Sequence, residues 1–285
     1  MTLLDRIAEC HAFDASRYLP FRIGAAQVGW IARDLAPRLD SYAGVFVVGR
    51  DGVSLAPQLD TFEARSRAVE GVARELFEQG IIPRWRDEPY PVLPLDDERR
   101  EGAPLMRLDR GAVPAFGVRA FGVHLNGFVR QARALRMWVA RRSPEAGLHP
   151  GKLDQLVAGG LPLGRTPLQT LIEEAKDEAN VPQALARRAR PIGCLSYCLE
   201  TPSGVSPATM FIYDLELGPG FRPRNNDGEL AGFHLWALDE VRGRVADTLE
   251  FKPNANLVVI DFLIRHGLIA AGDPDFAALA EGLGR

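Results

Sequence analysis

Three acidic residues stand close together in the second half of the chain. Asp177 and Glu178 lie three and four residues after Glu174, and at about 100° per residue of helix the three occupy an arc of roughly 100°. Carboxylates at these spacings repel one another, and in the C-terminal half of a helix they also oppose its dipole. A divalent cation relieves both costs, because Mg²⁺, or Mn²⁺ in its place, binds through a few carboxylates and substrate phosphates. The spacing alone leaves two interpretations open, a metal site and an acidic helix face that simply lies in water, and charge runs of this kind usually face water.

The helix that carries these carboxylates has well-marked ends. Thr166 is suited to the N-cap, Pro167 suits the first helical position, and Gln169 completes a capping box. Asn180 favours the left-handed conformation in which many helices end. The sequence therefore predicts a helix over residues 168–179 that presents the acidic residues on one face and an apolar stripe on another.

The segment from Gly159 to Val181 resembles the Nudix box. In that box a glycine, five residues, Glu and seven further residues precede Arg-Glu-apolar-any-Glu-Glu-any-Gly-apolar. When the two are aligned at Val181, Glu174 and Glu178 match box glutamates, and Asp177 replaces another with a shorter carboxylate. The resemblance implies that these three residues bind the metal of a pyrophosphohydrolase.

The loop before the helix departs from the box at two positions. A strand is expected to end at Gly159 and Gly160, but Arg165 then stands where the box has Glu, and Glu173 stands where it has Arg. Because the two exchanges are complementary, they predict an ion pair of reversed polarity between loop and helix. The alternative is that both side chains merely face water, where an ion pair stabilises little.

The resemblance extends beyond the box to segments 122–129, 153–161 and 251–267. These segments resemble one Nudix subfamily, which is related to the C-terminal part of fungal thiamine pyrophosphokinase fusions. Members of that subfamily carry an additional N-terminal domain, which segment 21–31 resembles. The similarity therefore covers most of the chain.

This resemblance implies a fold and a reaction. The fold is an α/β (α+β) protein in which a small α+β domain precedes a Nudix α/β/α sandwich with a mixed sheet. A change of pattern near residue 113 predicts that the first domain spans residues 1–112 and the Nudix domain residues 113–285. The implied reaction is hydrolysis of thiamine diphosphate, or of damaged analogues such as oxo- and oxythiamine diphosphate, to the monophosphate and inorganic phosphate.

Periodicity and turn residues place further elements. Asp51-Gly52 predicts a type I′ turn within a hairpin over residues 45–55. We expect helices over residues 62–77 and 257–265, and strands over residues 116–129, 135–140, 153–158, 192–199 and 210–217.

Hydrolysis also needs a general base, and the substrate needs groups that hold it. Glu229 precedes an expected strand and is our candidate base beside Glu178, although an acid in such a loop can equally be a turn residue. His124 and Asn126 lie two apart on a strand, so they share a face and are candidates for lining the pocket. The alternative for His124 is a core histidine with satisfied hydrogen bonds.

Further polar residues are candidates for binding the substrate. Asn254 either binds it or, like Asn256, caps the helix that follows. Arginine side chains suit phosphate, and a group of them surrounds one expected strand. The sequence does not choose among these arginines, which are Arg130, Arg133, Arg136, Arg141 and Arg142.

Composition limits the class of protein. The 285 residues carry a formal net charge of −3, which does not suggest a nucleic-acid binder. The chain holds three cysteines, an odd number that favours free thiols. No apolar stretch approaches the ~20 residues of a membrane span, and the first residues read as a short amphipathic helix rather than a signal peptide. We therefore expect a cytoplasmic protein that acts on a small-molecule diphosphate without a membrane partner.

Two other functions remain open at this point. One is a broader Nudix hydrolase that acts on nucleoside diphosphate derivatives. The other is a degenerate Nudix domain that binds a ligand without hydrolysing it, which the exchanged Arg165 and Glu173 motivate. The N-terminal domain either covers the pocket or supports a homodimer.

Overall fold

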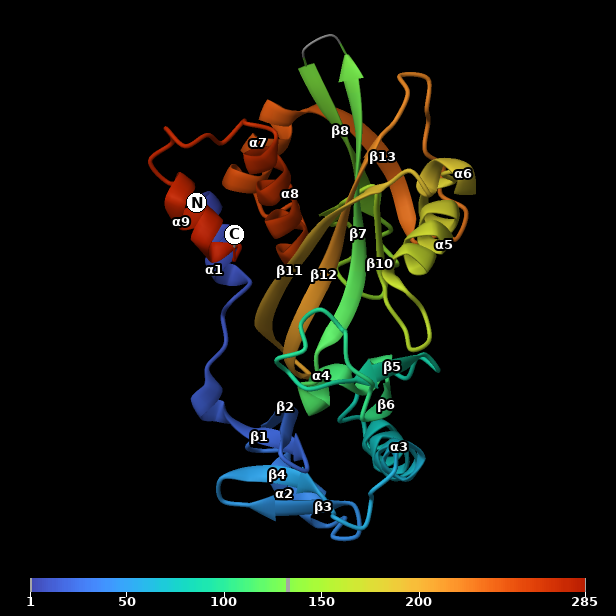
Figure 1. Ribbon diagram of the computed structural model, residues 1–285, viewed down its shortest axis with the longest axis vertical. Coiled ribbons are helices and arrows are strands. Elements are labelled where there is room, and N and C mark those ends of the chain that lie inside the picture. The colour runs from blue at the N-terminus through green and yellow to red at the C-terminus, as the bar shows by residue number, and fades with distance from the viewer. Residues whose placement is uncertain (1, 132–133, 285) are drawn as a thin grey trace.

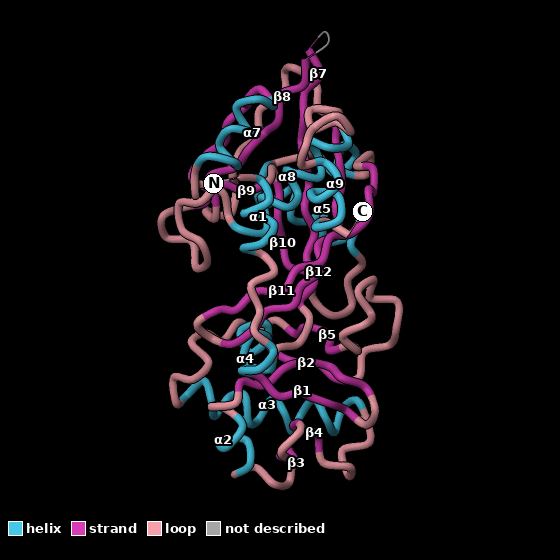
Figure 2. Tube along the Cα trace, turned by 90° about the vertical axis from the view of Figure 1, so that its left-hand side faces the viewer, coloured by secondary structure: helices cyan, strands magenta, loops and turns pink. Residues whose placement is uncertain are grey.

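The computed structural model describes residues 2–131 and 134–284. These residues form an elongated molecule with a small sheet at one end and a large sheet at the other (Figure 1). Strands β11 (Arg190–Thr201) and β12 (Gly204–Glu216) of the large sheet reach down to the short helix α4 (Val113–Phe116), as the side view in Figure 2 shows. The two parts of the molecule meet at this junction.

The small sheet belongs to the N-terminal part of the chain. It has the order β2-β1-β4-β3 and consists of β1 (Tyr18–Ile23), β2 (Ala26–Ala32), β3 (Phe46–Gly49) and β4 (Gly52–Leu55). Around it lie the 3₁₀ turns η1 (Ala15–Arg17) and η2 (Arg110–Ala112), the helices α2 (Ala36–Asp40) and α3 (Phe62–Glu78), and the two-stranded ribbon of β5 (Pro89–Val92) and β6 (Met106–Asp109). Its core joins the rings of Phe21, Phe46 and Phe116, whose centroids lie 6.0 to 6.1 Å apart.

Local signals in this part predict the elements better than their details. The helix expected over residues 62–77 forms as α3, and the Thr61 hydroxyl caps it by accepting a hydrogen bond from the Ala64 amide. The hairpin of β3 and β4 also forms. The prediction of a type I′ turn was wrong, because Arg50 and Asp51 occupy the turn and neither has the positive φ that this turn type requires.

The large sheet is mixed. Its strands follow the order β11-β12-β7-β8-β13, with β10 paired to β7 and β9 paired to β8. Strand β12 runs parallel to β7, and the other pairs are antiparallel. The remaining strands are β7 (Ala120–Gln131), β8 (Ala134–Arg142), β9 (Leu153–Asp154), β10 (Val157–Gly160) and β13 (Leu230–Ala237).

Helices cover both faces of this sheet. Because successive strand residues point to opposite faces, Val123 and Leu125 of β7 pack with Leu171 of helix α5 (Pro167–Ala179). Met210 and Ile212 of β12 pack on the other face, in the core that holds α7 (Leu238–Asp247) and α8 (Pro253–Arg265). Helix α6 (Gln183–Ala186) follows α5, and α9 (Phe276–Gly282) ends the described chain. The α/β/α sandwich with a mixed sheet that the sequence led us to expect is confirmed.

The first helix packs against the last ones. Helix α1 (Leu3–Glu9) contacts α7, α8 and α9, so the two ends of the chain lie side by side (Figure 1). Arg6 is fully buried there, and its guanidinium donates to the carbonyls of Val245 and Thr248 at 2.9 and 2.7 Å. Residues 2–10 thus share the core of the sandwich, whereas residues 113–118 pack with the small sheet. The division at residues 112 and 113 stays a prediction.

Several elements differ from the expectation. The strand predicted from residue 116 begins only at Ala120, because α4 and the left-handed Gly117, with φ of 56°, come first. The helix predicted over residues 257–265 begins at Pro253, and α7 and α9 were not anticipated. Within the described ranges, no helix is both long enough and apolar enough to cross a membrane.

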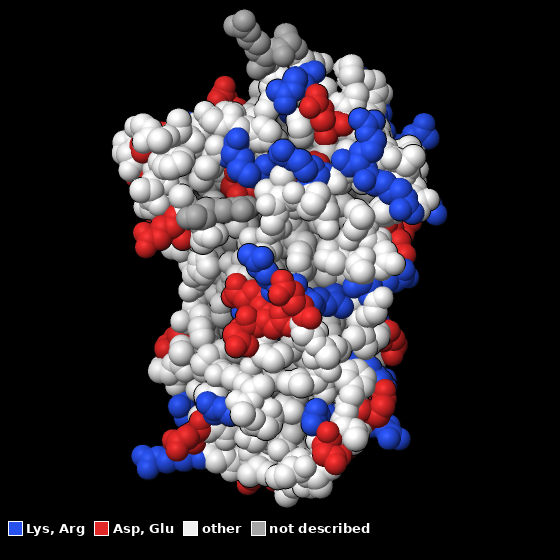
Figure 3. Space-filling model, viewed as in Figure 1, with Lys and Arg blue, Asp and Glu red and all other residues white. Residues whose placement is uncertain are grey.

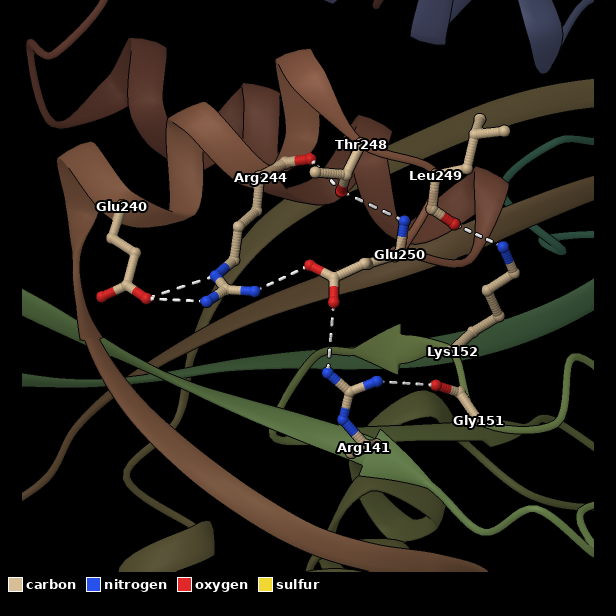
Figure 4. A network of polar contacts seen from close by, with 8 residues as sticks. All are labelled: Arg141, Gly151, Lys152, Glu240, Arg244, Thr248, Leu249 and Glu250. Atoms are coloured by element: carbon tan, nitrogen blue, oxygen red, sulfur yellow. Dashed lines mark hydrogen bonds and ion pairs between the residues drawn. The ribbon is translucent and has the colours of Figure 1, made fainter.

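A polar network fixes the segment that leads into α8 (Figure 4). The Glu250 carboxylate accepts hydrogen bonds from Arg244 at 2.7 Å and from Arg141 at 3.4 Å, and Arg141 also donates to the Gly151 carbonyl at 2.9 Å. The ammonium of Lys152 donates to the Leu249 carbonyl. These contacts tie α7, β8 and residues 143–152 to the start of α8.

The buried arginine gives a test of how α1 is anchored. Replacing Arg6 with Ala leaves two carbonyls without donors, so we expect the free energy of unfolding to fall by about 2 to 3 kcal/mol. Urea unfolding measures this loss, and Arg38→Ala on the exposed side of α2 is the control, with a change below about 0.5 kcal/mol. Equal stability of the two variants contradicts the anchoring role.

Candidate active site

Helix α5 begins and ends where the sequence predicts. The Thr166 hydroxyl accepts from the Gln169 amide at 3.3 Å, and the Gln169 side chain accepts from the Thr166 amide at 3.0 Å. Asn180 ends the helix in the left-handed region with φ of 52°, and its side chain accepts from Asn226 at 3.3 Å. These caps fix the rotation of the helix, so that part of its acidic face is turned toward β10.

Glu178 is the most deeply buried of the three acids. Its side chain is among the buried polar groups, and Oε2 accepts a hydrogen bond from the Ala158 amide of β10 at 2.8 Å. Burial raises the pKa of Glu178 well above its usual value, and the neighbouring charge of Glu174 raises it further. The folded protein thus holds a carboxyl group that resists ionisation unless a positive charge joins it.

Glu174 lies beside it and packs on the glycine that precedes the loop. Burial raises the pKa of Glu174 to about 7, although the nearby Arg110 guanidinium opposes the shift, and the Glu229 charge adds to it. A Cβ built on Gly159 would lie 2.3 Å from the Glu174 carboxyl carbon, so only glycine leaves room for this contact. Gly160 is equally confined, because its Cβ would lie 1.9 Å from the Tyr90 hydroxyl.

Asp177 does not join this pair. Its side chain is exposed, and its backbone carbonyl accepts from the Asn226 amide at 3.0 Å. Among the described residues, no three His, Cys, Asp or Glu side chains already converge as a metal-binding group. The structure therefore brings together two of the three predicted metal-binding carboxylates, Glu174 and Glu178.

This pair fits a hard divalent cation. Two adjacent carboxyl groups with raised pKa values are stabilised when a cation takes the place of their protons, and oxygen donors suit Mg²⁺ or Mn²⁺.

The surface of the molecule also carries charge of both signs. On the face shown in Figure 3, acidic side chains cluster at the waist of the molecule with basic side chains next to them. Both signs of charge thus meet where the two parts join.

A cavity of about 320 Å³ lies at the junction beside β10. Its wall on the large sheet includes the backbone of Gly159 and Gly160 and the side chain of Glu229. The Glu229 carboxylate lies 3.8 Å from Arg142 Nη2, and 59% of its side chain is exposed. Glu229 is therefore placed at the cavity, near the carboxylate pair whose pKa values it raises.

His124 also lines the cavity, and its hydrogen bonds fix its tautomer. Gln155 Nε2 donates to the Ala255 carbonyl at 3.0 Å, so Gln155 Oε1 accepts from His124 Nδ1 at 2.6 Å. Burial and the nearby Lys252 charge lower the pKa of His124 to about 4. At neutral pH the ring is uncharged and its single proton is on Nδ1, which leaves Nε2 as a hydrogen-bond acceptor.

Of the two asparagines expected to bind the substrate, one lines the cavity and the other does not. Asn126 was a wrong choice for the cavity wall: it is fully buried and donates to Asp214 at 3.0 Å. Asn254 does line the cavity, and its amide nitrogen lies 3.4 Å from the Met210 sulfur. The expectation that Asn254 or Asn256 caps α8 was wrong, because Lys252 is the N-cap residue and no side chain caps this end.

The basic residues of the cavity come mostly from an unexpected segment. Of the arginines around β8, Arg142 lines the cavity, whereas Arg133 lies outside the described residues. Arg130 pairs with Glu216, Arg136 donates a hydrogen bond to the Leu235 carbonyl, and Arg141 pairs with Glu250. Residues 83–114 of the N-terminal part supply further basic wall residues, Arg84, Arg86 and Arg110. Sequence periodicity misses them, and the one signal in this segment is its high content of arginine and proline.

The exchanged pair at the start of the box forms an ion pair. Arg165 Nη1 lies 2.5 Å from Glu173 Oε1, and about half of each side chain is exposed. The contact joins the loop after β10 to the second turn of α5. The predicted pair of reversed polarity is therefore present.

Known proteins resemble this chain over nearly its full length. It is 38% identical to Nudix hydrolase 24, chloroplastic, of Arabidopsis thaliana, over 97% of this chain and 76% of that protein. It is 37% identical to Nudix hydrolase 20, chloroplastic, of the same plant, over 88% of this chain and 69% of that protein. An uncharacterised Saccharomyces cerevisiae protein is 28% identical over 79% of this chain and 69% of its own length. A family model described as a domain of unknown function (DUF4743) matches residues 2–120.

The raised pKa of Glu174 predicts how stability depends on pH without metal. The unfolded carboxyl ionises near pH 4.5 and the folded one near pH 7, so the folded state binds more protons between these values. The contribution of Glu174 to stability should therefore fall as pH rises from 4.5 to 7, by on the order of 2 to 3 kcal/mol. The raised pKa of Glu178 adds a loss in the same direction.

Thermal melting in EDTA at pH 5 and pH 8 measures this effect. Added MgCl₂ should raise the melting temperature more at pH 8, because fewer protons then compete with the cation for the carboxyl groups. Glu174→Gln should reduce the pH dependence, with the part that is due to Glu178 remaining, whereas Glu173→Gln, on the same helix, should leave it unchanged. A profile unchanged by Glu174→Gln contradicts the assignment.

The ion pair of Arg165 and Glu173 gives a charge-exchange test. Each single change, Arg165→Glu or Glu173→Arg, places like charges 2.5 Å apart in the present geometry. The double variant restores opposite charges, so its kcat/KM should exceed that of either single variant by about threefold or more. A double variant no better than the singles shows that the pair does not matter to the site.

Proposed function

This chain belongs to the Nudix hydrolase family, and from that premise we propose that it hydrolyses thiamine diphosphate, or its oxo and oxythiamine analogues, to the monophosphate and inorganic phosphate. Family membership makes it an enzyme that cleaves phosphoric anhydrides. The observation that carries the proposal is the buried pair of Glu174 and Glu178 beside a cavity with a cationic wall. The subfamily resemblance of segments 122–129 and 251–267 supports the thiamine moiety.

Glu174 and Glu178 would hold the metal, with Mg²⁺ as the proposed ion and Mn²⁺ as a substitute. When bound, the ion would neutralise charge on the diphosphate and make a bound water more acidic. Asp177 remains a candidate ligand, and its exposed side chain would have to turn from solvent to contribute. The hydrogen bond from the Ala158 amide holds Glu178 in place for this role.

The chain itself supplies the proton acceptor. We assign Glu229 as general base, because its carboxylate lies on the cavity wall and close enough to raise the pKa of both box glutamates. Arg142, 3.8 Å away, restrains the Glu229 side chain without neutralising it in a tight pair. Glu178 contributes to catalysis through the metal rather than by taking the water proton.

His124 would recognise the organic part of the substrate. Its Nε2 accepts hydrogen bonds, so it favours a ring that presents an N–H group, such as the amino group of an aminopyrimidine. Asn254 lies on the same wall and offers both a donor and an acceptor. A cavity of about 320 Å³ matches a single small ligand.

A substrate screen with MgCl₂ separates the enzyme hypotheses. We expect thiamine diphosphate or its oxo analogues to give the highest kcat/KM, with phosphate as product. Much faster cleavage of nucleotide sugars or dinucleotides favours the broader nucleoside-diphosphate hydrolase instead. No turnover on any diphosphate favours the domain that binds a ligand without hydrolysis.

Glu178→Gln tests the metal centre directly. We expect turnover to fall by more than about a hundredfold, because the amide cannot supply a charged ligand to Mg²⁺. Asp177→Asn is the matched control on the same helix and should cost less than about tenfold, since its side chain faces solvent. Steady-state phosphate release measures the activity of both variants. Equal losses contradict the view that Glu178 contributes more to metal binding than Asp177 does.

Location and assembly rest on the sequence alone. We propose a cytoplasmic protein, although the two plant relatives carry the word chloroplastic in their names. The homodimer considered above stays a prediction.

A further inference from the structure

The N-terminal part is fastened to the loop that precedes α5. The Leu163 amide donates to the Pro89 carbonyl at 2.8 Å, and Arg100 Nη2 donates to the Pro162 carbonyl at 2.7 Å. Gly160 has no room for a side chain because the Tyr90 hydroxyl lies against it. Residues 83–114 are thereby held in place as one wall of the cavity.

Two arginines of this wall lie side by side. A Cβ built on Gly147 would lie 2.2 Å from Arg84 Nη1 and 3.2 Å from Arg86 Nη2, so both guanidinium groups approach one point. The loop that holds Gly147 also contributes Leu148 and His149 to the cavity. Because Gly147 has no side chain, this loop can lie close to both guanidinium groups, and both arginines remain exposed.

These two arginines differ from the other cations of the cavity. Arg110 pairs with Glu88 at 2.9 Å, and Lys252 pairs with Asp154 at 2.5 Å. Within residues 2–131 and 134–284, neither Arg84 nor Arg86 has a side-chain hydrogen bond or an acidic partner. Two exposed guanidinium groups that approach one point without a carboxylate beside them favour an anion that can bridge them.

We propose that Arg84 and Arg86 form a phosphate-binding subsite that takes the terminal phosphate of the diphosphate substrate. The guanidinium forks match phosphate oxygens, and the subsite opens into the same cavity as Gly159 and Glu229. The N-terminal part is then a component of the active site, because the sandwich alone lacks this pair. That the bound phosphate belongs to the substrate rests on the proposed function. That Arg84 and Arg86 bind a phosphate anion does not.

Binding of a diphosphate that cannot be hydrolysed tests the subsite independently of turnover. The probe is methylene diphosphonate, titrated by calorimetry into the full chain with MgCl₂. Arg84→Gln combined with Arg86→Gln should raise Kd by about tenfold or more, and changes to lysine at both positions should recover part of the loss because they keep the charge. Arg107→Gln is the matched control, since Arg107 lies in the same part but pairs with Glu63 at 3.1 Å.

Kinetics give the second readout. In the double glutamine variant kcat/KM for thiamine diphosphate should fall by about tenfold or more, because the two arginines contact the phosphate on one side of the cleaved anhydride bond. A melting temperature equal to that of the wild type shows that the fold is kept. If the double variant binds methylene diphosphonate like the wild type, or the wild type does not bind it, the subsite is overturned. If binding depends on the arginines but no thiamine compound is hydrolysed, the subsite stands and the proposed substrate fails.

Discussion

The site depends on one costly arrangement, the burial of the Glu178 carboxyl beside the Glu174 carboxyl. Burial and mutual repulsion both oppose ionisation, and among the described residues the hydrogen bond from the Ala158 amide is the contact that favours the charged form of Glu178. That hydrogen bond requires α5 to lie close against β10, and in this arrangement Gly159 leaves room for the Glu174 side chain, since a Cβ there would lie 2.3 Å from its carboxyl carbon. A divalent cation compensates the cost, so the local fold and the proposed chemistry share one cause.

The cavity distributes charge in a way that suits an anhydride. Glu174 and Glu178 lie behind the backbone of β10, Glu229 lines the cavity, and residues 83–114 bring arginines to the same cavity, with Arg110 close to Gly160. A diphosphate with its metal carries charge of both signs and therefore suits a cavity whose wall holds both a carboxylate and arginines. The two parts of the molecule therefore need each other for binding, whatever their contribution to each other's stability.

Local sequence signals predicted the helix that carries Glu174 and Glu178, but they missed the arginines that the N-terminal part brings to the cavity. The capping box and Asn180 define α5 within one residue, because caps act over one helical turn. The period of two correctly put His124 and Asn126 on one face of β7, but the cavity covers only one end of that face, and Asn126 lies beyond it against Asp214. Arg84 and Arg86 lie some ninety residues before Glu174, and only the packing of the two parts brings them to the cavity. The sequence did not predict that α1 packs against α8, because no local pattern encodes a contact between the two ends of the chain.

The exchanged Arg165 and Glu173 argue for a working box rather than a decayed one. In a domain that has lost its reaction, charges in the loop and the helix are free to change independently, and a complementary exchange has no advantage. Here the two side chains still meet at 2.5 Å, although each is about half exposed and the pair alone stabilises the fold by at most about 1 kcal/mol. A contact so weak in stability has its value in position. It restrains the loop after Gly160 against the helix that holds Glu174 and Glu178, and this restraint does not depend on which partner carries the positive charge.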